Sequence, residues 1–556
     1  MATMQAATKE RGTIPVACAS SRVFPKLQPE LTAKIVSCLD PNDVPFFRLV
    51  NKAAAAQFSG PQHTTIRLSE PVAPHAFAAH WLAPGAARGL TQNRRWQLLC
   101  LTAASGVVAN LEMAVRAAGC LPTYKVFVAA ASTGKLEPCQ WLWDHGCPTK
   151  DLYCESSGLL AAAAGGGHRH VCEWLLTLDL AWSSGGAAEA ARGGHVGLME
   201  WLQQVRPQLN VHTTSPAWEK RKLVEGAADG CDLATLQQQW GDGDLLDERA
   251  KEEALVAAAG SPTPDWAAKV EWLEAQGCLK DLGAAAAAAV CSDAASRLAW
   301  LQGRGYPLGT GTVCTAAEVG NLAAVQYLLE EAGVEEDGSY PETATFIAAR
   351  EGHLEVLQAL HSADWCFDAE DMVLEAAENG HLHVLAWLVE LEGEEWLGSG
   401  SDLLTAAARS GNMELLTWLV ERGCDGWSDD ATTSAAASGC EEALEWLVAR
   451  GCPMKDDGSP YTMPCRDGDL AMARLLRRMG APWGPAGSVV METALVAPVP
   501  MLRWLLEEGC PVGDYEAALA KAGQRASGRE EALALLEAHR MAQQEGGKAA
   551  AADDDG

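Results

Sequence analysis

Small and apolar residues recur along this chain in a fixed order that predicts pairs of short helices. Two alanines precede a glycine, a histidine or asparagine often follows it, and leucines and tryptophans at helical spacing come next. The clearest copy begins at Ala348-Ala349 and turns at Gly352-His353. Paired alanines let one helix approach its neighbour closely, and glycine supplies the positive φ that ends it. The pattern therefore predicts a helix, a tight turn and a second helix with one apolar face.

The same order returns from about residue 100 to 540 with a period of about 27 to 33 residues. A second anchor, Trp-Leu, follows each glycine and is read at Trp387-Leu388, Trp418-Leu419 and Trp446-Leu447. A period of this length is typical of a solenoid, in which each unit buries its apolar face on its neighbours. We therefore predict an all-α fold, a helix-turn-helix solenoid over residues 96–540 with about 13 to 15 units.

The repeated phrase Ala-Ala-x-x-Gly-His-Leu-x-x-Leu, followed by a second helix and Gly-small-x, resembles the ankyrin repeat. The resemblance covers about four-fifths of the chain. It implies helix pairs stacked in an L shape and a surface that binds proteins. The Thr-Pro-Leu-His opening of the family is absent, and several units have only about 28 residues. The resemblance therefore implies β-turn fingers that are short or missing.

A different pattern precedes the repeats, over residues 23–58. Leucine and isoleucine fall on one helix face, the turn Asp40-Pro41-Asn42-Asp43 follows, and a second short helix comes next. This segment resembles an F-box, the helical motif that docks onto the Skp adaptor of cullin-RING ubiquitin ligases, although Gln28 replaces a usual proline. The resemblance implies an adaptor-binding face made of Leu27, Pro29, Leu31, Ile35 and Leu39. The alternative is a helical cap that seals the first ankyrin unit.

Three further stretches lack a repeat pattern. Residues 1–22 are expected to be a flexible N-terminus, with a weak organelle transit segment as the alternative. Residues 59–95 contain four prolines that break helical periodicity, so a linker or irregular connection is expected there. Residues 541–556 have nothing to bury and are expected to form a disordered tail.

Charge and cysteine usage limit the partners and the compartment. The 73 acidic residues exceed the 42 basic ones and give a formal net charge of −31, which repels phosphate backbones and anionic lipid. No apolar run approaches the ~20 residues of a membrane-spanning helix. The 18 cysteines occur without a secretion signal, which fits a reducing compartment. We expect protein partners, a monomer outside any complex, and a cytoplasmic or nuclear location.

A search for chemistry finds no catalytic elbow, phosphate loop, metal motif or Cys-x-x-Cys pair, so we expect no enzyme activity, cofactor or metal. One set of aromatic residues is less routine, because it falls between repeats, where ankyrin proteins present their binding edge. These target-binding candidates are Trp182, Trp365, Trp396, Trp427 and Trp483. Exposed tryptophans often anchor interfaces, while buried ones would pack between units.

Two functions remain open. The chain is either the substrate receptor of an SCF-type ubiquitin ligase, which recognises its target with the ankyrin surface, or a non-enzymatic scaffold whose N-terminal helices only cap the solenoid. Exposure of the apolar face on residues 27–50 favours the receptor. Burial of that face against residues 97–125 favours the scaffold, because terminal repeats need a covering element.

Overall fold

The computed structural model describes residues 3–5, 28–151, 156–206, 215–241, 246–338, 343–393, 401–424, 426–485 and 487–554. Nearly all regular structure in these ranges is helical, which confirms the predicted all-α solenoid. Two three-residue strands, β1 (Thr3–Gln5) and β2 (Thr65–Arg67), form a small antiparallel ladder. Apart from β1, the predicted flexible N-terminus over residues 1–22 lies outside the described residues.

Fifteen helix pairs make up the stack in the described residues. The first helices of the pairs are α6 (Gln92–Ser105), α8 (Tyr124–Ser132), α10 (Leu159–Gly165), α12 (Ala187–Arg192), α14 (Pro216–Gly230), α16 (Glu248–Gly260), α18 (Leu282–Ala289), α20 (Thr310–Glu318), α22 (Ala344–Glu351), α24 (Ala369–Glu378), α26 (Ser401–Ser410), α28 (Asp429–Ser438), α30 (Ser459–Arg466), α32 (Ser488–Thr493) and α34 (Tyr515–Ala522). The second helices are α7 (Val108–Ala118), α9 (Leu136–Asp144), α11 (Arg169–Leu175), α13 (Val196–Val205), α15 (Leu233–Trp240), α17 (Trp266–Ala275), α19 (Ala294–Gly303), α21 (Leu322–Gln326) with the π-helical turn η4 (Tyr327–Glu331), α23 (Leu354–Ser362), α25 (Leu382–Glu392), α27 (Met413–Glu421), α29 (Glu441–Ala449), α31 (Leu470–Arg478), α33 (Val499–Glu507) and α35 (Arg529–Asp554).

The pair α22 and α23 illustrates how the sequence determines one unit. The side chain of Thr343 accepts a hydrogen bond from the backbone N–H of Phe346 (3.2 Å), so α22 begins there. Gly352 ends the helix at φ 81°, which glycine adopts without a steric penalty. Leu357 and Leu360 of α23 are fully buried against neighbouring units. Local sequence therefore sets both helices and the turn between them, as the repeat pattern predicts.

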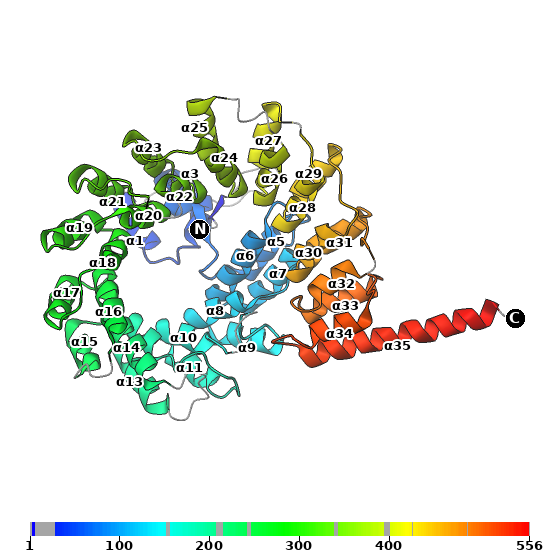
Figure 1. The fold of residues 1–556 in the computed structure, drawn as a ribbon, viewed down its shortest axis with the longest axis horizontal. Coiled ribbons are helices and arrows are strands. Elements are labelled where there is room, and N and C mark those ends of the chain that lie inside the picture. The colour runs from blue at the N-terminus through cyan, green and yellow to red at the C-terminus, as the bar shows by residue number, and fades with distance from the viewer. Residues whose placement is uncertain are drawn as a thin grey trace.

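The two helices of each unit form two concentric rows. In Figure 1 the even-numbered first helices line the inside of a ring and the odd-numbered second helices lie outside them. Successive first helices pack through fully buried alanines such as Ala348, Ala349, Ala376 and Ala377. The second helices pack through leucine and tryptophan instead. Because helix axes approach more closely across small side chains than across large ones, the inner row is shorter and the stack curves.

This curvature brings the first unit against late units of the same stack, where α6 and α7 lie beside α28 and α30 (Figure 1). Backbone hydrogen bonds cross between them, from Leu121 N–H to Gly468 O (3.2 Å) and from Ala471 N–H to Gly119 O (3.0 Å). The stack is therefore closed into a ring, and α32 to α35 continue past the closure (Figure 1). We call the contact between residues 88–121 and 411–471 the seam.

The structure corrects the expectation of an irregular connection over residues 59–95. The segment contains α4 (Pro61–Thr64), β2 and α5 (Pro74–Trp81). Both helices begin with a proline, which is tolerated in the first helical turn. Phe77 and Trp81 are buried in the same core as the helix pairs, and α5 packs on α7. The helix α5 therefore seals the first unit of the stack.

The C-terminal end also differs from its expectation. A disordered tail was predicted over residues 541–556, but α35 continues as a helix to Asp554. Near its start, Ala532 and Leu536 are fully buried against the stack. Alanine, glutamate and lysine favour helix, and a helix already started on a packed turn extends readily. The end of α35 therefore projects beyond the other helices (Figure 1).

Candidate functional site

A small helical unit precedes α5. It consists of α1 (Pro29–Val36), α2 (Val44–Phe47), the 3-10 turn η2 (Arg48–Val50) and α3 (Lys52–Gln57). Its own core is formed by Val36, Val44 and Phe58, with Leu39 and Phe47 packed against them. Among the described residues this core is separate from the continuous core of the stack. We call residues 28–58 the N-terminal unit.

The N-terminal unit exposes several large apolar side chains. These residues, which we call the apolar face, are Leu31 (48% exposed), Ile35 (39%), Phe46 (42%), Leu49 (79%) and Val50 (54%). The stripe of α1 that faces inward is the neighbouring one, where Thr32 and Val36 are buried. Single exposed apolar residues are ordinary in proteins, but several on one small unit are typical of an interaction surface.

The predicted adaptor-binding residues lie in three settings. Pro29, Leu31 and Ile35 are exposed on α1, and the last two belong to the apolar face. Leu39 is half-buried and packs against the small core, so it contributes less to any docking surface. Leu27 lies outside the described residues. The helix-face prediction therefore identifies part of an exposed apolar surface.

Sequence reasoning missed three residues of the apolar face, Phe46, Leu49 and Val50. They lie in a four-residue helix and a three-residue turn, which are too short to display helical periodicity. The available signal was composition, because residues 44–50 hold six apolar residues and a single arginine. A turn of this length buries only some of its side chains, so the others must face solvent or a partner.

Two asparagines fix the N-terminal unit and leave the apolar face open. The Asn42 amide nitrogen donates hydrogen bonds to the carbonyl oxygens of Arg67 (2.7 Å) and Pro71 (3.1 Å). The Asn42 carbonyl oxygen accepts from the Arg67 backbone N–H (2.7 Å). Asn51 begins α3 by accepting a hydrogen bond from the backbone N–H of Ala54 (2.8 Å). The unit is thereby held to the segment that leads into α5.

The tryptophans predicted as target contacts lie mostly inside the stack. Trp182 and Trp365 are only 2% and 5% exposed, so the packing alternative describes these two residues. Trp427 and Trp483 are half-buried, and each ring lies against another aromatic ring. Trp396 lies outside the described residues. A role in target binding therefore stays a prediction, and in the described residues it now concerns Trp427 and Trp483.

A cavity of about 440 Å³ opens on four consecutive first helices, α12 to α18, of the inner row. Gly260, Gly283 and Ala287 leave space there, because their side chains are absent or small. The charged residues of its lining are Arg192, Glu225, Asp229, Arg249, Glu252, Glu253 and Asp281. Five carboxylates therefore face two arginines across the cavity, and Arg221 and Lys222 next to the lining pair with Glu253 and Glu225.

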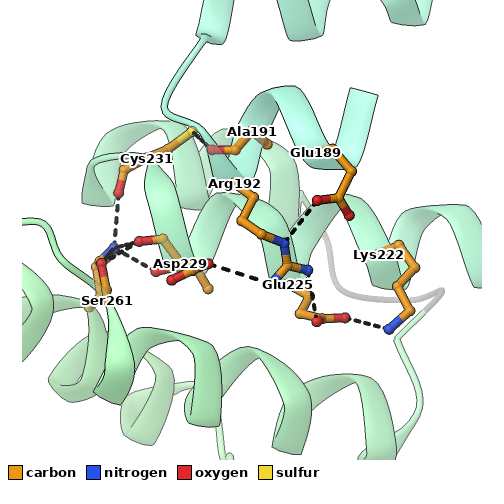
Figure 2. Close-up of polar contacts among 10 residues, drawn as sticks. Glu189, Ala191, Arg192, Lys222, Glu225, Asp229, Cys231 and Ser261 are labelled. Atoms are coloured by element: carbon orange, nitrogen blue, oxygen red, sulfur yellow. Dashed lines mark hydrogen bonds and ion pairs between the residues drawn. The ribbon is translucent and has the colours of Figure 1, made fainter. Parts of the chain in front are cut away.

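Most charge at one end of the cavity is paired (Figure 2). Arg192 lies 3.3 Å from a carboxylate oxygen of Glu189, 3.0 Å from Glu225 and 3.5 Å from Asp229. Lys222 lies 2.7 Å from the other carboxylate oxygen of Glu225. Burial alone would raise the pKa of Glu225, but the hydrogen bonds from Lys222 and Arg192 hold it below its ordinary value. Burial raises the pKa of Asp229, although Arg192 opposes the change.

The metal-binding side chains and the buried thiols of the described residues show how far the structure supports metal or thiol chemistry. Within them no group of three or more His, Cys, Asp or Glu side chains is arranged to hold a metal ion. Burial raises the pKa values of the Cys120 and Cys139 thiols to about 12, so both stay protonated near neutral pH. No helix in the described ranges is both long and apolar enough to cross a membrane.

Comparisons with known proteins identify ankyrin repeats in one part of the chain. A family model of ankyrin repeats in three copies matches residues 313–396. No curated protein matches the chain. Among solved structures, the pentatricopeptide repeat protein PPR10 from maize is 13% identical, with 92% of this chain and 88% of that chain covered and a TM-score of 0.25. PPR10 in complex with an 18-nucleotide psaJ RNA element is 12% identical, with 92% and 87% covered and a TM-score of 0.23.

TM-scores this low show no shared detail of fold or ligand. The family match is local, but it falls on the units in which the sequence pattern is clearest, α20 to α25. Ankyrin repeats bind proteins through their surfaces, which indicates a protein-protein interaction protein. Residues 313–396 therefore carry three ankyrin repeats within a longer stack of helix pairs.

Proposed function

We propose that this chain is a substrate receptor that docks the Skp adaptor of a cullin-RING ubiquitin ligase through its N-terminal unit and holds a target protein on its ring. Catalysis then belongs to the partner complex, and the chain raises the effective concentration of the target lysine. A cytosolic or nuclear location is part of the proposal. The apolar face is the observation that carries it, because the predicted docking residues Leu31 and Ile35 are exposed.

The position of α5 also supports the proposal. A terminal repeat needs an element to cover its outer side, and α5 does this through the buried Phe77 and Trp81. The N-terminal unit has its own small core and leaves its apolar face uncovered in the described structure. The scaffold alternative assigned the capping role to these N-terminal helices. With α5 in that role, the apolar face needs another explanation.

The test is capture of a purified Skp adaptor by the immobilised full-length chain. We expect the wild type to retain the adaptor and Leu31→Asp and Ile35→Asp to lose at least about tenfold in affinity, because a charge desolvated in a complex is costly. Both positions are exposed in the free chain, so neither substitution should unfold it. Circular dichroism on each variant verifies this.

A matched control is Leu279→Asp, which places the same charge on an exposed leucine of the stack (71% exposed). It should capture the adaptor as well as the wild type does. Adaptor retention with a cullin recruited in turn would support the receptor. Failure of the folded wild-type chain to bind any adaptor would leave the non-enzymatic scaffold as the function. Equal capture by all four proteins would contradict docking on the apolar face.

A further inference from the structure

A ladder of side-chain hydrogen bonds joins successive units of the stack. The residue directly after a turn glycine reaches back to a carbonyl oxygen at the end of the preceding first helix, where intrahelical donors are missing. Asn412 Nδ2 donates to Gly380 O (2.9 Å), and Asn321 Nδ2 donates to Ala289 O (2.9 Å). His353 Nε2 lies 3.2 Å from Glu318 O, and His381 Nε2 lies 2.9 Å from Arg350 O. This position, which we call the turn slot, holds a donor in each of these four units.

Two consecutive units near the seam depart from this rule. The turn slot after Gly439 holds Cys440, and the slot after Gly468 holds Asp469. An ionised aspartate only accepts hydrogen bonds, so Asp469 has no proton for the carbonyl oxygen of Gly439. Asp469 is nevertheless fully buried. A buried carboxylate in a donor position requires a cation from elsewhere.

The cation comes from the other end of the stack. Arg95 of α6 is 1% exposed, and its two terminal nitrogens each pair with one carboxylate oxygen of Asp469. The same guanidinium donates to Gly439 O (2.8 Å), the carbonyl equivalent to the Gly380 O that Asn412 binds, and to Ala118 O (2.8 Å). Arg95 therefore supplies the turn-slot hydrogen bond that Asp469 lacks, from a residue 374 positions away.

The backbone around this pair is shaped for close approach. The turn glycines Gly411 and Gly439 have φ of 63° and 75°. A Cβ on Gly411 would lie 2.7 Å from Thr91 Cγ2, and one on Gly439 would lie 2.7 Å from Gln92 Cβ. The first turn of α6 thus rests on bare backbone at successive turns of the late units. The contacts across the seam thus involve turns and helix ends.

The helices on each side of the seam also pack on neighbouring helices of their own side. The helix α6 packs on α7 and α8, and α28 packs on α26 and α30, so both edges belong to folded stacks. The contacts that join them include backbone hydrogen bonds, the pair of Arg95 with Asp469 and the ion pair of Arg88 with Glu441. Separation would therefore expose polar groups to water, which hydrates them, and leave the apolar core intact.

We propose that Arg95 and Asp469 are a latch that holds the solenoid closed as a ring, and that the ring opens at this seam without unfolding. While closed, the inner row is reached only through the two mouths of the ring. Once open, it is also reached from the side by a protein partner. The acid in the turn slot makes the latch specific, because this unit depends on Arg95 for the hydrogen bond to its turn-glycine carbonyl that Asn412 makes from the turn slot of its own unit.

The decisive variant is Asp469→Asn in the full-length chain. Asparagine preserves the cap of α31, in which Asp469 Oδ1 accepts from Met472 N–H (3.1 Å), as Asn412 does for its own helix. It also supplies the missing donor for Gly439 O and removes the charge that pairs Arg95. We expect hydrogen exchange at the seam amides of Leu121, Glu442 and Ala471 to rise by at least about tenfold. Small-angle scattering should show a larger maximum dimension.

Controls separate opening from general damage. Arg88→Met removes a seam arginine that pairs with Glu441 (3.2 Å) at a partly exposed site, and it should leave exchange unchanged. The double variant Arg95→Met with Asp469→Asn has no unpaired buried charge and should open as Asp469→Asn does. Unchanged seam exchange in Asp469→Asn would overturn the latch. Faster exchange throughout the stack, including the turn at His381, would overturn it too, because it would assign the pair to general stability.

Discussion

The stack and the N-terminal unit use apolar residues differently. In the stack, leucines such as Leu357 and alanines such as Ala377 are fully buried in one continuous core. In the N-terminal unit the core has three buried residues, and Leu31 and Leu49 remain exposed. Apolar residues hold units together in the first region and leave a face open in the second. The stack thus uses its apolar residues to stabilise the fold, because neighbouring units bury them. The N-terminal unit presents part of its apolar residues as a surface.

Truncation of a buried leucine in the stack should have the largest effect. Leu357→Ala removes a fully buried side chain from α23, and we expect a loss of about 2–5 kcal/mol in the free energy of unfolding. The loss should spread to adjacent units, because each buries its face on the next. Urea denaturation followed by circular dichroism measures the loss, and hydrogen exchange maps its extent. A loss confined to α23 would contradict the shared core.

The same kind of change in the N-terminal unit should stay local. Val36→Ala truncates one of the three residues of its small core. We expect the free energy of unfolding of the N-terminal unit to fall by about 1–2 kcal/mol. Hydrogen exchange should accelerate in α1 and α2 and stay unchanged from α6 onward, because the two cores are separate. Faster exchange in the stack would show that the N-terminal unit stabilises the first helix pair after all.

Much of the stack could be predicted because its determinants are local. Paired alanines, a turn glycine and an amphipathic second helix act within about 30 residues. Each helix pair can therefore be predicted from its own stretch of sequence. The shared face of Leu31 and Ile35 on α1 was predicted for the same reason, since the two residues lie four positions apart on one helix, while its exposure or burial was left open. Helix α5 was not predicted, because Pro74 looks like a helix breaker in sequence but in fact begins the helix.

The remaining features depend on contacts between distant residues. Arg95 and Asp469 look like ordinary surface residues in sequence, and only the accumulated curvature of many units brings them together. Trp182 and Trp365 sit between repeats in sequence, yet neighbouring units cover them. The part of the docking face in α2 and η2 was missed because elements of three or four residues show no period. Neither the curvature of the stack nor burial by neighbouring units can be predicted from a short stretch of sequence.

Acid should weaken the stack and spare the N-terminal unit. Burial lowers the pKa of His381 below its ordinary value of 6.5, and the described part of the N-terminal unit contains no histidine. The unfolded chain then binds more protons, so the stability from His381 is present above pH 6.5 and is lost as pH falls below it. We expect the denaturation midpoint of the stack to fall between pH 7 and 5. His381→Asn replaces the imidazole by an amide that takes up no proton in this range, so it should reduce this fall.

The smallest effect on stability should come from the apolar face. Leu31→Ala alters a side chain that is 48% exposed, so we expect a change within about 0.5 kcal/mol in the free energy of unfolding. Adaptor capture should nevertheless weaken, because truncation removes apolar contact area from the docking surface. Urea unfolding of the variant gives its free energy of unfolding, and titration with the adaptor gives its affinity. A large loss of stability would mean that Leu31 is part of the fold, and the N-terminal unit would then resemble the stack in how it uses its apolar residues.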